Sequence, residues 1–282
     1  MLHHSSPDNQ PKFDMVESAG VGYKYLFDER VYLLRLIAAP FIIKFVTVLI
    51  LALFGENVSF LSANLILLPS LFAEGWLLAQ IIRSFTFNER WPMALSGESK
   101  LDQNKLFNRQ NCIIAGIITY VLINLAFYGL QSILVLSPED LETLTQISNG
   151  TPLAEGQTFS FLPIVTMIVI LFSMVFWFPL IWLYIAASAN IYFKDFYLTI
   201  MKQRLSMRLI ATWMICLIPF LVALAFIRNF IVTAFGMDLS ALSTAESILL
   251  ESVTQFIGFL ISIVSTVAIT NGISQYFKTN SQ

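Results

Sequence analysis

Long apolar stretches alternate with short polar ones along most of this chain. A helix of about 20 apolar residues crosses the roughly 30 Å hydrocarbon core of a bilayer. Six segments reach that length: 33–54, 61–82, 113–136, 161–187, 209–235 and 248–270. Proline interrupts four of them, which is tolerated where neighbouring helices, hydroxyl side chains or water satisfy the freed carbonyl groups. The pattern predicts an all-α, polytopic membrane protein with six transmembrane helices arranged as three hairpins.

The basic residues are distributed on one side of these segments. Four precede or open the first span, five follow the second, four follow the fourth and one lies in the C-terminal tail, so 14 of the 16 share one side. The loops 55–60, 137–160 and 236–247 contain no Lys or Arg. Because Lys and Arg are retained in cytoplasmic loops, the sequence predicts that both termini are cytoplasmic.

The composition supports lipid as the solvent of this chain. Hydrophobic residues make up 57% and charged residues only 12%, whereas soluble domains average about 25% charged. The first apolar segment follows a long polar run, so we expect a retained anchor rather than a cleaved signal. Residues 1–12 and 271–282 are expected to be polar tails, and the spacing of Ser243 and Glu246 predicts a capping box at the start of the last helix.

Two basic stretches rich in aromatic residues are expected on the cytoplasmic membrane surface. Apolar residues recur at three- and four-residue steps in 13–32, and apolar and basic residues alternate in 191–208. Both patterns predict amphipathic helices whose cations face anionic head groups. Ordinary positive-inside anchoring explains the pattern as well as specific lipid recognition does. The candidate head-group contacts are Lys24, Arg30, Arg35, Lys194, Lys202, Arg204 and Arg208.

Ionisable residues inside the spans are costly unless they are paired or hydrated. Lys44 lies roughly 16 Å into the first span and Glu74 roughly 12 Å into the second, so the two are expected to meet. The pair has two interpretations. It is either a structural ion pair that fixes the packing of the first hairpin, or a pair that couples transport to the movement of a proton or ion. Arg228 and Glu251 form a second candidate pair near the outer ends of the last two spans, where a structural role is favoured.

No pattern typical of an enzyme is present in the sequence. It contains no HExxH metal motif, no Walker A loop and no nucleophile elbow. The spans contain no His or Asp, which an intramembrane Ser–His or paired-Asp protease would need. We therefore expect a protein without enzymatic activity, cofactor, metal or nucleic-acid partner.

Two stretches resemble a family of six-span bacterial inner-membrane proteins. They are LIWLYIAASANIYFKDFYLTIMKQRLSMRLIATWMICLIPF (180–220) and AGVGYKYLFDERVYLLRLIAAPF (19–41). The first is similar to a span that ends in small residues, followed by a basic segment and a new span after Arg-Leu. The family includes YciC-like proteins and the membrane domain attached to some glycerophosphodiester phosphodiesterases. The chain departs from it at Asn190-Ile191-Tyr192, where a small residue and proline usually stand.

The resemblance implies a lipid- or envelope-related accessory role in a bacterial cytoplasmic membrane, without catalytic residues to carry over. The leading hypothesis is therefore a non-enzymatic scaffold or accessory protein that engages anionic lipid, with a homo-oligomer or another membrane protein as further partners. The alternative is a small secondary transporter or channel that uses Lys44 and Glu74. A polar cavity at the level of that pair favours transport, and apolar packing around it favours a scaffold.

Overall fold

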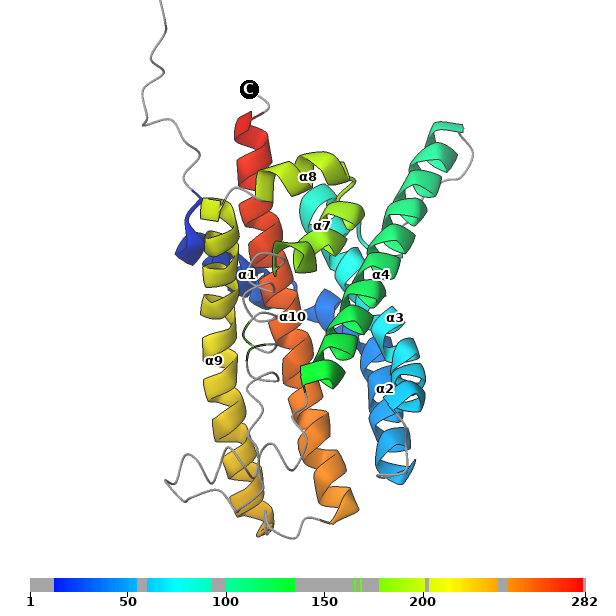
Figure 1. The fold of residues 1–282 in the computed structure, drawn as a ribbon, viewed down its shortest axis with the longest axis vertical. Coiled ribbons are helices and arrows are strands. Elements are labelled where there is room, and N and C mark those ends of the chain that lie inside the picture. The colour runs from blue at the N-terminus through cyan, green and yellow to red at the C-terminus, as the bar shows by residue number, and fades with distance from the viewer. Residues whose placement is uncertain are drawn as a thin grey trace, which may run out of the picture.

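The computed structural model describes residues 13–54, 60–92, 100–134, 165, 168, 178–200, 203–237 and 243–280, and within them it is all helical apart from short connections. Figure 1 shows long helices arranged side by side with shorter ones at the upper end. The helices are α1 (Met15–Asp28), α2 (Arg30–Phe54), α3 (Phe60–Phe87), α4 (Lys100–Leu134), η3 (Phe178–Trp182), α7 (Leu183–Ser188), α8 (Phe193–Ile200), α9 (Gln203–Phe235) and α10 (Thr244–Asn280). The predicted all-α class is confirmed for this part of the chain.

Among the described residues, five helices are long and apolar enough to cross a membrane: α2, α3, α4, α9 and α10. They contain five of the six predicted spans, which indicates a membrane protein. The predicted span 161–187 lies mostly outside the described residues. The loop 137–160 lies wholly outside them.

Most spans are longer than their apolar windows. α4 begins 13 residues before the predicted start at Ile113, and α10 continues ten residues past the predicted end at Thr270. Hydropathy detects only the part of a helix that meets lipid, so polar extensions of the same helix escape it. Ser243 confirms the predicted cap of α10, because its hydroxyl accepts from the Glu246 amide while its own amide donates to the Glu246 carboxylate.

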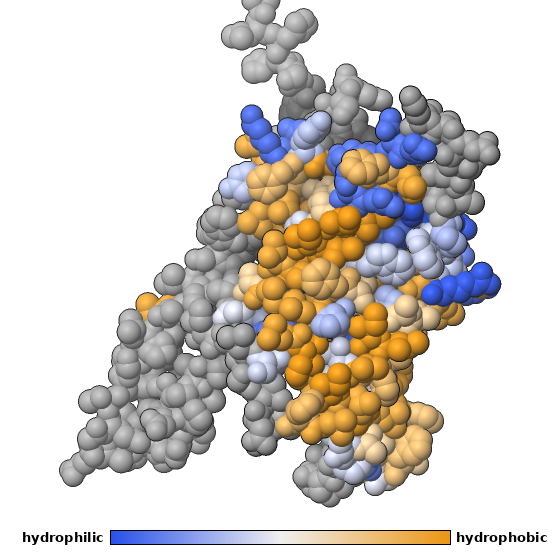
Figure 2. Space-filling view, turned by 90° about the vertical axis from the view of Figure 1, so that its right-hand side faces the viewer, coloured by the Kyte–Doolittle hydropathy of each residue, from blue (hydrophilic) through white to orange (hydrophobic). Residues whose placement is uncertain are grey.

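The ends of the helices that carry the basic residues gather at one end of the bundle. Figure 1 shows the N-terminal ends of α4 and α9, the short helix α8 and the C-terminal end of α10 together at the top. In Figure 2 an apolar band lies below a hydrophilic upper end. We refer to this upper end as the basic end.

Helix α1 packs into the bundle through small residues. Asp14 caps it by accepting hydrogen bonds from the Val16 and Glu17 amides. Ser18, Ala19 and Gly22 form its buried face. This face contacts α9 and α10, and the Tyr23 hydroxyl donates to the Cys216 carbonyl of α9 at 2.7 Å.

The apolar face that the sequence predicts for 13–32 is not the one that packs. Val16, Gly20, Phe27 and Val31 of that face are exposed, and only Phe13 is fully buried. Small residues permit close helix approach, so the smaller face contacts protein and the larger apolar side chains are left to meet lipid. The second stretch, 191–208, contains α8, which ends at Ile200, and the first turns of α9, which begins at Gln203. Residues 201–202 lie outside the described residues, so the prediction of one amphipathic helix over this stretch stays a prediction.

The tightly packed core includes facing parts of α3 and α10. Leu77, Ile81 and Ile82 of α3 and Phe259 and Ile263 of α10 are essentially inaccessible. Helix α9 instead exposes a series of large apolar residues: Ile218, Leu221, Val222, Phe226, Phe230 and Phe235. Such a surface is typical of a helix that faces acyl chains rather than water.

Candidate functional site

Lys44 and Glu74 meet between α2 and α3. Lys44 Nζ lies 3.0 Å from Glu74 Oε2, and the side chains are 20% and 7% exposed. The Lys44 ammonium also lies 4.9 Å from the centre of the Phe259 ring, a cation–π distance. The structure therefore brings together the first pair that the sequence singled out.

The pair lies near the middle of the two helices. Lys44 is ten residues from the end of α2 at Phe54 and fourteen from its start at Arg30, which places it about 15 Å and about 21 Å from those ends. A charge at this depth is stable only when it is neutralised by a partner or reached by water.

The Glu74 carboxylate has contacts beyond Lys44. The Ser262 hydroxyl of α10 lies 3.4 Å from Glu74 Oε1 and donates to it. Tyr120 of α4 interacts electrostatically with the same carboxylate. Three other helices, α2, α4 and α10, thus supply groups around this acid of α3, which makes Glu74 a central point of contact in the bundle.

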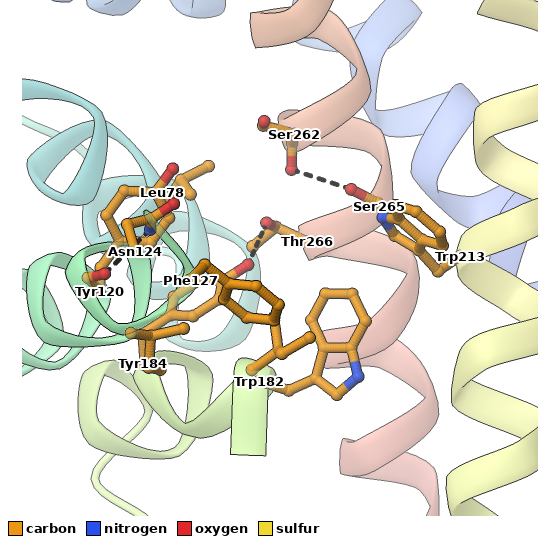
Figure 3. Close-up of a pocket in the computed structure, with 12 residues that line it drawn as sticks. Leu78, Tyr120, Asn124, Phe127, Trp182, Tyr184, Trp213, Ser262, Ser265 and Thr266 are labelled. Carbon is orange, nitrogen blue, oxygen red and sulfur yellow. Dashed lines mark hydrogen bonds between the residues drawn. The ribbon is translucent and has the colours of Figure 1, made fainter. Parts of the chain in front are cut away.

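A pocket of about 300 Å³ lies beside this acid. Tyr120 and Ser262 belong both to its wall and to the surroundings of Glu74. Figure 3 shows aromatic rings and hydroxyl groups of separate helices facing one another across this space. The lining residues come from α3, α4, η3, α7, α9 and α10: Leu78, Tyr120, Ile123, Asn124, Phe127, Ile181, Trp182, Tyr184, Trp213, Ser262, Ser265 and Thr266.

Several polar groups of the pocket already have protein partners. The Tyr184 hydroxyl and Thr266 Oγ1 are 2.8 Å apart. The Asn124 amide donates to the Tyr120 carbonyl, and the Ser265 hydroxyl donates to the carbonyls of α10. The wall is thus mixed, with fixed hydroxyls between large apolar rings, which is typical of a ligand pocket.

A second charged cluster lies at the basic end, and the sequence did not single it out. Arg83 of α3 and Arg109 of α4 are buried, with side chains 5% and 6% exposed. Arg83 Nε donates to Glu89 Oε2 at 2.6 Å, and Arg109 Nε lies 3.4 Å from the same oxygen. Both arginines were counted only as loop charges in the positive-inside distribution, because the polar ends of α3 and α4 are not visible in hydropathy.

The other bonds of these arginines join three helices. Arg109 Nη2 donates to Gln80 Oε1 at 2.8 Å, and Arg83 Nη1 donates to the Ser188 carbonyl of α7 at 3.0 Å. Among the described residues the buried Arg109 Nε makes no hydrogen bond, although Glu89 Oε2 is close enough for an ion pair. Two buried cations therefore share one carboxylate.

The candidate head-group contacts lie on the surface of the basic end as far as they are described. Lys24, Arg30, Arg35, Lys194 and Arg208 are exposed. The side chains of Lys202 and Arg204 lie outside the described residues. The Arg30 guanidinium donates a hydrogen bond to the Phe27 carbonyl, which links the start of α2 to the end of α1. The Arg30 side chain is exposed at the same time.

The predicted pairing of Arg228 with Glu251 is wrong. Glu251 accepts a hydrogen bond from Gln255 in its own helix and borders a groove with Val48 and Leu51 of α2. Arg228 is exposed on α9. Glu251 therefore lies on a side of α10 that borders α2, which depth along a hairpin cannot reveal.

Two tyrosines of α1 are kept neutral by their surroundings. Burial raises the pKa of Tyr23 to about 12, and it also raises the pKa of Tyr25, which the hydrogen bond to Ser84 partly offsets. Both phenols therefore stay protonated at physiological pH. They can hold α1 against α9 and α3 as neutral hydrogen-bond donors.

The described residues contain no group of three His, Cys, Asp or Glu side chains able to hold a metal. Searches of family models, curated proteins and solved structures give no match to this chain. The resemblance to six-span bacterial proteins accordingly stays a prediction.

Proposed function

We propose that this chain is a non-enzymatic accessory or scaffold protein of a bacterial cytoplasmic membrane that binds anionic lipid at its basic end. The observation that carries the proposal is the concentration of exposed cations there, next to an apolar band. Anionic lipid attracts such cations by about 1 kcal/mol for each Lys or Arg near the surface. Binding of lipid by these exposed cations requires no catalytic side chain.

We further propose six spans with both termini in the cytoplasm. In Figure 1 the successive described long helices α4 and α9 both begin at the basic end and run downward. The chain must therefore return to the basic end between them, which supports a crossing within 135–200. The positive-inside distribution then assigns the basic end to the cytoplasm.

Native mass spectrometry of protein purified in a mild detergent tests the lipid proposal. We expect a stoichiometric anionic lipid, such as phosphatidylglycerol, to stay bound in preference to zwitterionic phosphatidylethanolamine. Protein that carries no lipid, or both lipids equally, would contradict the proposal.

A secondary transporter is the second candidate function, because the pocket shares Tyr120 and Ser262 with the surroundings of Glu74. A transport cycle would use Glu74 to couple the pocket to a proton or cation. The short Lys44–Glu74 contact supports a structural role for the pair more directly, which is why transport takes second place.

A further inference from the structure

The Arg83–Arg109 cluster carries more positive charge than its surroundings neutralise. Glu89 is the carboxylate that contacts both guanidinium groups. The neighbouring cation Arg90 is paired with Glu29 instead. Among the described residues the cluster therefore keeps a surplus of one positive charge. Burying an uncompensated charge is strongly unfavourable, and a bound anion would offset this cost.

The geometry of the cluster suits an oxyanion. Arginine presents a planar fork of donors that matches phosphate and carboxylate oxygens. The Gln80 and Ser188 oxygens and Glu89 hold the two forks in place. Among the described residues the buried Arg109 Nε makes no hydrogen bond, and it lies 3.4 Å from the Glu89 carboxylate, the anion with which a phosphate would compete. Glu89 is 24% exposed, so the cluster is reached from the surface at this side chain.

The depth of the cluster matches lipid phosphate. Arg83 is nine residues from Glu74 along α3 toward the basic end, a rise of about 14 Å. If Glu74 lies near mid-membrane, Arg83 lies about half of the roughly 30 Å hydrocarbon thickness away from it. That level is the boundary where head groups begin.

We propose that Arg83 and Arg109 form a binding site for a phosphate group, presented either by an anionic lipid head group or as free phosphate, with Glu89 as the competing internal anion. As a lipid site, this inference rests on the proposed lipid-binding function and gives it a location. The exposed cations Lys24, Arg30, Arg35, Lys194 and Arg208 then act as a general attraction. The buried pair supplies the specific contact.

The test compares three variants in nanodiscs of phosphatidylcholine with one fifth phosphatidylglycerol, read out by native mass spectrometry. Arg109→Gln is expected to lower retained phosphatidylglycerol about tenfold or more, since charge-assisted contacts are lost. Arg228→Gln, which removes an exposed cation of α9 far from the basic end, is expected to change it less than about twofold. Glu89→Gln removes the competing anion and is expected to raise retention.

Equal retention by folded Arg109→Gln and the unchanged protein would overturn the site while leaving lipid binding intact. If Arg109→Gln does not fold, Glu89→Gln decides, and unchanged retention in that variant would overturn the site.

A second arm titrates inorganic phosphate into lipid-free protein in detergent and measures thermal stabilisation. Stabilisation that Arg109→Gln abolishes, without phosphatidylglycerol retention in the nanodiscs, would assign the site to free phosphate and would contradict the lipid function. If neither lipid retention nor phosphate stabilisation is observed, the phosphate site and the proposed lipid-binding function are both overturned.

Discussion

Replacing Glu74 by leucine is expected to destabilise the folded protein by about 3–5 kcal/mol, the cost typical of removing one partner of a buried ion pair. Lys44 would remain near the middle of the helices without its carboxylate partner, with the Phe259 ring beside its ammonium group. The free energy of unfolding in mixed detergent micelles measures the effect.

The double variant Lys44→Met/Glu74→Leu serves as the control. Apolar replacements of buried pairs are often neutral or stabilising, so we expect it to recover most of the loss. Glu74→Gln should lose less than Glu74→Leu, because its amide oxygen can still accept hydrogen bonds from Lys44 and Ser262. A Glu74→Leu variant as stable as the unchanged protein would show that the pair does not hold the bundle.

The same double variant separates the two candidate functions. A scaffold or lipid-binding protein keeps its activity when the pair is replaced by well-packed apolar side chains. A transporter that couples through Glu74 does not. If the double variant retains anionic lipid as the unchanged protein does, the pair has a structural role. Loss of retention in the folded double variant would contradict that role.

Placing a methyl group at Gly22 is the second change with a large expected effect. A Cβ there would lie 2.5 Å from the Val264 carbonyl oxygen and 3.3 Å from Ala268 Cβ of α10. The nearest atom is backbone and cannot rotate away. Gly22→Ala is therefore expected to cost about 1–3 kcal/mol of stability, as overpacking does.

Gly20 offers a matched control in the same helix, because a Cβ at that position meets nothing within 4 Å. Gly20→Ala should stabilise by up to about 1 kcal/mol through helix propensity alone. The two alanine variants are compared by the same unfolding measurement. If both stabilise equally, α1 lies on the membrane surface without packing on α10.

The sequence predicts the long helices well and their ends poorly. Lipid selects apolar residues over a fixed thickness, so the windows around Lys44 and Glu74 are visible in hydropathy. The inner end of α4, from Lys100 to Asn111, is polar and resembles a loop by composition. It is helical and carries Arg109 into the core, which only tertiary packing reveals.

The sequence predicts a contact in the candidate site where similar depth along two neighbouring helices is enough to bring two side chains together. Lys44 and Glu74 meet because they have similar depth and also face each other. Arg228 and Glu251 satisfy the first condition and fail the second. The helical spacing of Gln80 and Arg83, three residues apart on one face of α3, is the signal that would have pointed to the arginine cluster.

Site-directed cysteine labelling tests the six-span, cytoplasmic-termini account most directly. The native thiols Cys112 and Cys216 are buried and are first replaced by alanine. Single cysteines at Thr145 and Ala241 should react with a membrane-impermeant reagent from outside intact cells, and those at Gln103 and Gln203 should react only after lysis. Labelling of position 103 or 203 in intact cells, or protection of 145 and 241, would contradict the account.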